Sequence, residues 1–148
     1  MTDHPLPLER SDVERLMPHA GDMCLIDRVE TWDETRLQAR CWSHRQADHP
    51  LARDGRLSIW HALEYGAQAM AIHGGLLAAR QGQQLGQGLL AGARDLIFTR
   101  ATLSDLAGDL EIEVTQQFAQ MGSLIYDFRI ETQGHCLATG TATVVGRP

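Results

Sequence analysis

Lysine is absent from this sequence of 148 residues. Its thirteen Lys and Arg side chains are all arginines, against nineteen Asp and Glu, and the formal net charge is −6. Proteins that bind nucleic acid or anionic membranes present a concentrated basic surface. The charge balance therefore argues against both kinds of partner and leaves only single arginine-lined docking spots.

Cysteine is scarce and scattered. Cys24, Cys41 and Cys136 form no CxxC pair and no Cys/His metal spacing. No two histidines share a predicted helix or strand face at the spacing of metal ligands. We therefore expect reduced core cysteines and no metal site.

Several familiar signals are missing as well. The sequence shows no charged-then-apolar leader and no apolar run long enough to span a bilayer. It contains no glycine-rich phosphate loop, no GxSxG elbow and no HExxH zinc motif. We expect a cytoplasmic protein without membrane insertion, whose chemistry rests on side chains outside these motifs.

The patterns that are present predict one α+β domain over residues 1–148. The hydrophobic content of 43% suffices for a core. Apolar runs or two-residue alternation predict strands at 23–29, 37–42, 89–100, 110–115, 126–131 and 136–145. Two strands, one long helix and then four strands favour an antiparallel sheet with the helix laid across its face.

Local signals mark where some of these elements begin, end or become irregular. Ser11 and Glu14 form a capping-box pattern, which predicts a short helix over 12–17. Gly92 predicts an irregularity within a strand, and Gly122 and Gly134 predict turns.

The stretch from 48 to 80 contains a His-Pro loop, an Asp-Gly turn and the long helix, expected from about Ser58 to Arg80. One face of this helix is predicted to be apolar and to pack on the sheet, with Trp60, Leu63, Ala67, Met70, Gly74 and Leu77. Glu64 falls on the same face. A buried carboxyl is costly unless it is partnered or functional, so Glu64 is a candidate site residue.

His49, in the loop before the helix, is the second candidate. A histidine can take or give a proton near neutral pH, and a carboxyl that burial keeps protonated can act as an acid. Gln68 lies one turn after Glu64 and is placed to hydrogen-bond its carboxyl. Backbone N–H groups near Gly55, before the helix start, are placed to stabilise an enolate-like oxygen of a thioester.

Plain structural roles compete with each of these interpretations. His49 also fits a surface loop, Glu64 a structural ion pair, and Gln68 an exposed helix flank. Gly55 also fits a turn with no further role. His61 and His73 are expected to point away from the apolar face, with His73 toward solvent.

Four segments of the chain resemble the hotdog-fold 3-hydroxyacyl-[acyl carrier protein] dehydratases. They are LMPHAGDMCLIDRV, the His loop with the Glu-x-x-x-Gln helix, AGARDLIFTRATLSDLAGDL and the last strand, at 16–29, 48–68, 91–110 and 136–145. The sequence is most similar to the divergent branch associated with aryl polyene and related lipid biosynthesis. The resemblance spans nearly the whole chain in the family's order.

This resemblance implies a fold and an activity. The sheet would wrap the long helix, and the reaction would be dehydration of 3-hydroxyacyl thioesters to trans-2-enoyl thioesters, with the substrate carried on the phosphopantetheine of acyl carrier protein. His49 takes the place of the catalytic histidine, Glu64 that of the helix carboxylate and Gln68 that of the glutamine one turn later. The resemblance implies no metal and no cofactor beyond the carrier's phosphopantetheine.

The resemblance also implies a homodimer, or a heterodimer with a related hotdog dehydratase, with His49 of one subunit facing Glu64 of its partner. The loop departs from the main family pattern. Asp48 precedes His49, Pro50 follows it directly, and Asp54-Gly55 stands where the family has prolines. The spacing from the histidine to the glutamate is one residue longer.

Three alternatives stay open. One is a hotdog acyl thioesterase, which shares the fold and releases free acid. Another is a hotdog subunit with little activity alone that pairs with a second dehydratase chain. The third is a simple acyl-binding module. For docking to an acidic carrier protein, Arg94 and Arg100 are the candidate side chains.

Overall fold

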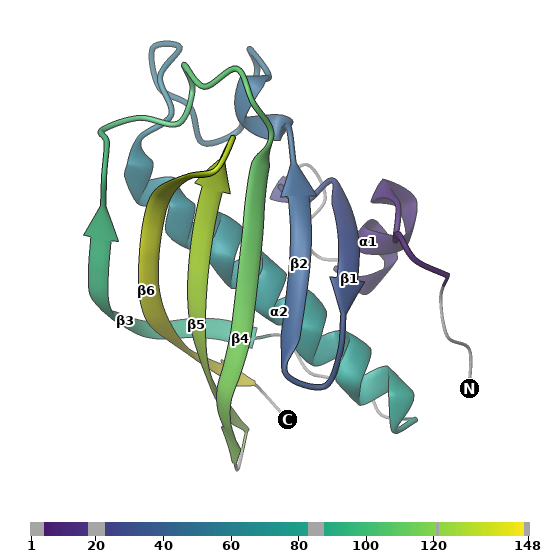
Figure 1. Ribbon diagram of the computed structural model, residues 1–148. Helices are drawn as coiled ribbons and strands as arrows, with labels where there is room; N and C mark the ends of the chain where they lie inside the picture. The colour runs from purple at the N-terminus through teal and green to yellow at the C-terminus, as the bar shows by residue number, and fades with distance from the viewer. Residues whose placement is uncertain (1–4, 18–22, 83–87, 121, 147–148) are drawn as a thin grey trace.

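Six antiparallel strands form one sheet in the order β1-β2-β4-β5-β6-β3. The computed structural model describes residues 5–17, 23–82, 88–120 and 122–146. The strands are β1 (Arg28–Trp32), β2 (Arg36–Cys41), β3 (Gly88–Phe98), β4 (Leu110–Gln120), β5 (Ser123–Thr132) and β6 (His135–Gly146). The predicted α+β architecture, with two strands before the long helix and four after it, is confirmed. Because the chain crosses the sheet between β2 and β3, β3 ends up at the far edge (Figure 1).

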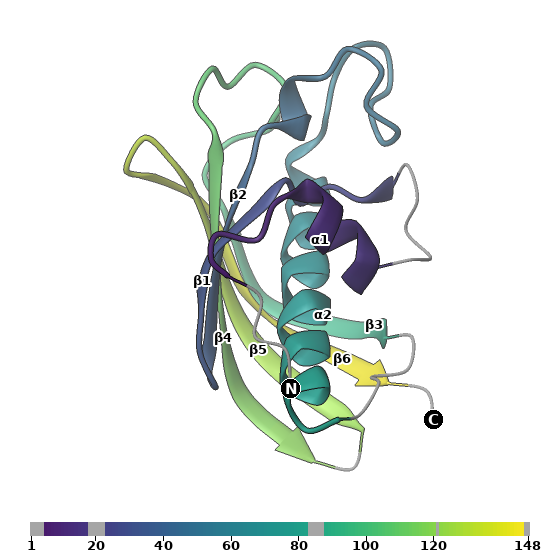
Figure 2. The same cartoon turned by 90° about the vertical axis from the view of Figure 1, so that its right-hand side faces the viewer.

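The long helix α2 (Ala62–Arg80) lies in the concave side of the curved sheet, with the short helix α1 (Arg10–Leu16) beside it (Figure 2). A 3₁₀ turn, η3 (Ile59–His61), leads into α2. Ser58 caps that turn, since its Oγ accepts a hydrogen bond from the Trp60 N–H at 3.2 Å. The helical segment thus begins and ends where the sequence predicted.

The face of α2 that packs on the sheet is not the predicted one. Its buried residues are Ala62, Tyr65, Gly66, Ala69, Met70, Ile72, His73, Gly74, Leu76 and Ala78. Of the predicted stripe only Met70 and Gly74 are buried, and Trp60 is 60% exposed. Glu64 is exposed too, so its predicted burial is wrong for the single chain. Alanine, glycine and leucine occur on several sides of this helix, so its periodicity does not select one face.

His73 is the second consequence of the misassigned face. It was expected to face solvent, yet it is completely buried. Its Nε2 bonds the carbonyl oxygen of Asp33 at 2.8 Å, and its Nδ1 bonds the hydroxyl of Tyr126 at 2.7 Å. Burial lowers the pKa of this imidazole. His73 therefore ties the helix to the sheet as a neutral group.

Two predicted boundaries are wrong for local reasons. Residues 23–27 form no strand, because side chains satisfy their backbone: Leu25 N–H donates to Gln68 Oε1 at 2.8 Å, and Ser43 Oγ donates to Leu25 O at 2.9 Å. Helix α1 begins at Arg10, so Ser11 lies inside its first turn and caps nothing.

The glycine signals hold at all three positions, and Gly122, with φ of 83°, lies in the turn between β4 and β5. The β3 register shifts between Leu90 and Gly92, as an irregularity at Gly92 predicted. Gln133 and Gly134 have φ of 49° and 80° and form the turn between β5 and β6.

Two of the three cysteines are core residues, as expected. Cys24 and Cys41 are buried, Cys136 is half-buried, and all three thiols are free. Within the described ranges, no helix is long and apolar enough to cross a bilayer.

Candidate active site

Two loops, 42–58 and 99–109, meet at the end of the molecule where β2 ends and β4 begins (Figures 1 and 2). Leu103 N–H donates to the Leu57 carbonyl at 2.8 Å, and Arg45 Nη1 donates to the Ala107 carbonyl at 2.6 Å. These bonds hold the loop that carries His49 against the loop 99–109.

His49 is buried, with 5% of its surface exposed, which excludes the surface-loop interpretation. Its Nδ1 accepts a hydrogen bond from the Leu51 N–H at 3.1 Å, and its Nε2 lies 3.1 Å from the Tyr65 hydroxyl. Burial lowers the pKa of the imidazole, and His61 and His44 lower it further, while Asp48 opposes them. His49 is therefore neutral at pH 7, the form that a general base requires.

Tyr65 is the residue that sequence reasoning missed. It projects from the first turn of α2, is completely buried, and bonds both His49 and the Ser43 hydroxyl, the latter at 2.8 Å. Burial raises the pKa of the Tyr65 phenol, so the hydroxyl keeps its proton. The available signal was the aromatic residue next to Glu64. A buried tyrosine needs a hydrogen-bond partner, so assigning the buried face of the helix correctly would have predicted Tyr65 to point inward and to have such a partner.

A buried carboxylate supports this network from behind. Asp27 Oδ2 accepts hydrogen bonds from the backbone N–H groups of Trp42 and Ser43, at 2.7 and 3.1 Å. Its Oδ1 pairs with Arg10 Nη1 at 2.8 Å. Because every oxygen of this carboxylate is bonded, it fixes the position of Ser43 and, through Ser43, of Tyr65.

Gln68 does not orient Glu64. Its Oε1 accepts from the Leu25 N–H at 2.8 Å, and its Nε2 donates to the Met23 carbonyl at 2.6 Å. The amide therefore holds the segment leading to β1 against α2, which is neither of the two roles that the sequence predicted for it.

Gly55 lies at the tip of an exposed turn. Asp54 and Gly55 have φ of 53° and 73°, and Arg53 and Arg56 exchange backbone hydrogen bonds at 2.9 Å. The N–H groups that follow already donate to oxygens within the chain, at residues 56, 57 and 59–61. This geometry favours the turn interpretation over an oxyanion site.

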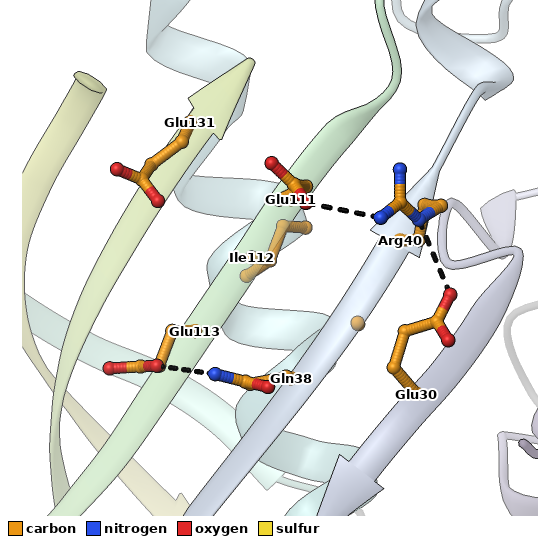
Figure 3. Close-up of a pocket in the computed structure, with 8 residues that line it drawn as sticks. Glu30, Gln38, Arg40, Glu111, Ile112, Glu113 and Glu131 are labelled. Atoms are coloured by element: carbon orange, nitrogen blue, oxygen red, sulfur yellow. Dashed lines mark hydrogen bonds and ion pairs between the residues drawn. The ribbon is translucent and has the colours of Figure 1, made fainter. Parts of the chain in front are cut away.

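A separate hollow of about 310 Å³ lies on the opposite, outer face of the sheet (Figure 3). Arg40 pairs there with Glu111 at 3.1 Å and with Glu30 at 3.3 Å. None of the predicted site residues lines it, and its walls are ion pairs of a solvated sheet face.

The two docking candidates differ in their surroundings. Arg94 has 73% of its side chain exposed on β3. Arg100 bonds the Thr102 carbonyl at 2.7 Å and the Asp105 carboxylate at 2.6 Å. Arg94 is therefore the freer of the two arginines for a partner.

A family model described as ApeP dehydratase, of the ApeP-like family, matches residues 11–148. The chain belongs to the ApeP-like family. This ApeP-like chain is therefore a dehydratase, a hydro-lyase, of aryl polyene biosynthesis. No curated protein sequence matched it.

Solved structures show the hotdog fold of this ApeP-like chain. The dehydratase heterocomplex ApeI:P from Xenorhabdus doucetiae aligns with a TM-score of 0.84 at 22% identity, over 98% of this chain and 93% of that one. The thioesterase HI1161 from Haemophilus influenzae aligns with a TM-score of 0.66 at 13% identity, over 99% and 92%. AziG from S. sahachiroi aligns with a TM-score of 0.58 at 15% identity, over 80% and 88%.

Proposed function

We propose that this ApeP-like chain eliminates water from 3-hydroxyacyl thioesters on the phosphopantetheine of an acyl carrier protein, giving trans-2-enoyl thioesters. The observation that carries the proposal is His49, a buried and neutral imidazole held in place at both ring nitrogens. A base fixed in this way suits abstraction of a proton next to a thioester carbonyl. The proposed chemistry uses no metal and no redox cofactor.

The proposed reaction has two proton transfers. His49 takes the proton from C2 of the acyl chain, and the C2–H electron pair moves into the enolate of the thioester. The enolate then forms the C2–C3 double bond as the C3–O bond breaks. A glutamate protonates the departing hydroxyl, which leaves as water. Solvent then carries the proton from the imidazolium back to the carboxylate. Each of the two proton transfers would need to contribute a rate enhancement of roughly 10²–10⁴-fold, which is typical of general acid–base catalysis.

The proposed acid, Glu64, needs a second chain. It is exposed in this chain, whereas His49 is buried against Tyr65. The ApeI:P structure from X. doucetiae is a heterocomplex, which supports pairing with a related hotdog dehydratase. In such a pair the histidine of one subunit would face the helix glutamate of the other.

The edge strand β3 supports the same assembly. Ile97 and Leu90 are 62% and 42% exposed on it, and the exposed Trp60 ring packs edge-on against Phe98 at 4.9 Å. An unpaired sheet edge with exposed apolar side chains favours association with another chain.

The acyl carrier protein is the second proposed partner. The carrier proteins that serve the resembled family are acidic, and an exposed arginine suits contact with an acidic surface. Arg94, on the same strand as Ile97, is the side chain we assign to this contact.

The test follows 3-hydroxyacyl carrier protein by mass as it loses water. We expect His49→Ala to lower turnover at least about 100-fold, because it removes the base. The matched control is His135→Ala, which truncates an exposed histidine in the β5–β6 hairpin. Full activity of the His49→Ala variant would exclude the assignment. Release of free thiol instead of enoyl product would identify a thioesterase.

A second candidate function is that of a subunit with little activity alone. The exposed position of Glu64 favours it, because the single chain then lacks an enclosed acid. Turnover by the isolated chain should be compared with turnover by its complex with a second hotdog dehydratase chain. Equal rates per site would exclude this candidate.

A further inference from the structure

The hydrogen-bond chain through His49 has a defined direction. At one end the Leu51 N–H can only donate, so Nδ1 of His49 carries the lone pair. At the other end the Leu25 carbonyl can only accept, so Ser43 Oγ–H donates to it at 2.9 Å. Between them, His49 Nε2–H donates to Tyr65, and Tyr65 O–H donates to Ser43.

The reverse order of protons fails at both ends. A proton on Nδ1 of His49 would face the Leu51 N–H across 3.1 Å, donor against donor. Tyr65 would then donate to Nε2 and Ser43 to Tyr65, which would leave two bare oxygens 2.9 Å apart at Leu25. Two unsatisfied buried contacts are costly, so the network selects the Nε2–H form of His49.

We propose that Tyr65 is a positioning residue that accepts a hydrogen bond from Nε2 of His49 and keeps that nitrogen turned inward, so that Nδ1 is the ring nitrogen that takes the substrate proton. This inference rests on the proposed function of His49 as the base.

The two hydrogen bonds of the His49 ring differ in how easily they break. Leu51 lies two residues from His49 in the same loop, next to the exposed Pro50. Tyr65 belongs to α2 and is held by Ser43, which is itself fixed by Asp27. The bond to Leu51 is therefore the one that an entering substrate displaces, and the bond to Tyr65 persists.

Proton transfer then follows from this geometry. The C2–H bond of the substrate breaks, the proton forms a bond to Nδ1, and the electron pair moves into the enolate of the thioester. The imidazolium that results keeps donating from Nε2 to the Tyr65 oxygen, and a hydrogen bond to a charged donor is stronger than one to a neutral donor. Tyr65 thus stabilises the charged state without touching substrate.

The experiment replaces Tyr65 by Phe and reads the His49 ring by ¹⁵N NMR as a function of pH, in the full-length protein. In the native protein we expect the Nε2–H tautomer. In Tyr65→Phe the Leu51 N–H still selects this tautomer, but the pKa of the His49 imidazole, read from the pH dependence of the same ¹⁵N signals, should be lower because the imidazolium has lost an acceptor. This readout is independent of turnover. An Nδ1–H tautomer in the native protein, or an unchanged pKa of His49 in the variant, would overturn the inference.

Kinetics of the same variant, measured in the complex with a hotdog partner chain, provide a second readout. We expect kcat to fall about 10- to 100-fold with KM nearly unchanged, because a hydrogen bond to the charged ring is lost. The acid limb of the pH profile should move to lower pH, since the imidazolium loses an acceptor. The pKa of His49 also depends on the charges of His44, His61 and Asp48, and these residues are unchanged in this variant.

Tyr126→Phe is the matched control. Tyr126 is the other buried tyrosine bonded to a histidine, His73, on the sheet side of α2. We expect its replacement to leave both the pKa of His49 and the pH profile unchanged. An equal shift in both variants would mean that Tyr65 acts only through stability. If His49→Ala is fully active, the proposed function fails, whatever the NMR measurement shows.

Discussion

Two buried histidines contact a tyrosine in this protein, but their hydrogen bonds run in opposite directions. His49 donates from Nε2 to Tyr65, whereas His73 donates from Nε2 to the Asp33 carbonyl and accepts at Nδ1 from Tyr126. The acceptor nitrogen of His73 bonds a group of the core, whereas that of His49, among the described residues, bonds only its own loop. This difference separates a structural histidine from one with a nitrogen available for chemistry.

The buried histidines make stability depend on pH. Burial lowers the pKa of His73 in the fold below the value of about 6.5 expected for the unfolded chain. As the pH falls below 6.5, the unfolded chain therefore binds more protons than the folded chain, and the free energy of unfolding decreases. The contribution of His73 is complete above that pH and is lost as the pH falls through the lowered pKa.

We expect the free energy of unfolding to drop between pH 7.5 and pH 5.5, by at most about 1.4 kcal/mol per pH unit for each such histidine. His73→Gln keeps hydrogen-bonding capacity and cannot titrate, so its stability should fall less over the same range. Urea unfolding of both proteins at the two pH values measures this. An identical fall would show that His73 does not contribute.

At the scale of elements, helix α2 does two things at once. One side packs on the sheet, and Gly66 permits that contact, since a Cβ there would lie 3.3 Å from Phe128 Cγ. The first turn on this side also carries Tyr65 to His49. Another side leaves Glu64 exposed, where a second chain would reach it.

Gly66→Val tests the close approach of helix and sheet. The added atoms would press on the Phe128 ring, and overpacking of this kind costs about 1–3 kcal/mol. Gly75→Val in the same helix is the matched control, because a Cβ at Gly75 meets no atom of the described residues within 4 Å. Thermal or urea unfolding should show the larger loss for Gly66→Val. Equal losses would mean that the change in helix propensity, and not contact with Phe128, sets the change in stability.

At the scale of the whole molecule, the open sheet has two edge strands, β1 and β3, and Leu8 forms an isolated bridge to Val29 of β1. β3 pairs only with β6 among the described strands, and Ile97 on it is 62% exposed. The proposed site needs a glutamate from another subunit, so assembly and activity should be lost together.

Ile97→Glu should weaken pairing, because a charge would be buried at the joined edge. We expect the variant to elute at lower mass in size-exclusion chromatography with light scattering, and turnover to fall with it. Phe118→Glu is the control, since Phe118 is also an exposed apolar residue, 46% exposed, but lies on β4. Unchanged assembly of Ile97→Glu would place the interface elsewhere.

The sequence by itself determined the class of fold, the limits of the long helix and the candidate base. Strand alternation, turn glycines and the Ser58 cap act between residues close in the chain, so their signals are local. His49 was found because its residue type and loop resemble a known family. The same patterns misplaced β1, since they do not show that Gln68 and Ser43 satisfy the backbone around Leu25.

Only the tertiary structure decided which side of α2 is buried and what His49 contacts. The helix is apolar or small on several sides, so its orientation follows from packing on the sheet and from Gly66 against Phe128. That orientation exposes Glu64 and turns Tyr65 inward to His49 and Ser43. A hydrogen-bond network that joins residues 25, 43, 49 and 65 depends on distances between separate segments, and no local pattern in the chain encodes those distances.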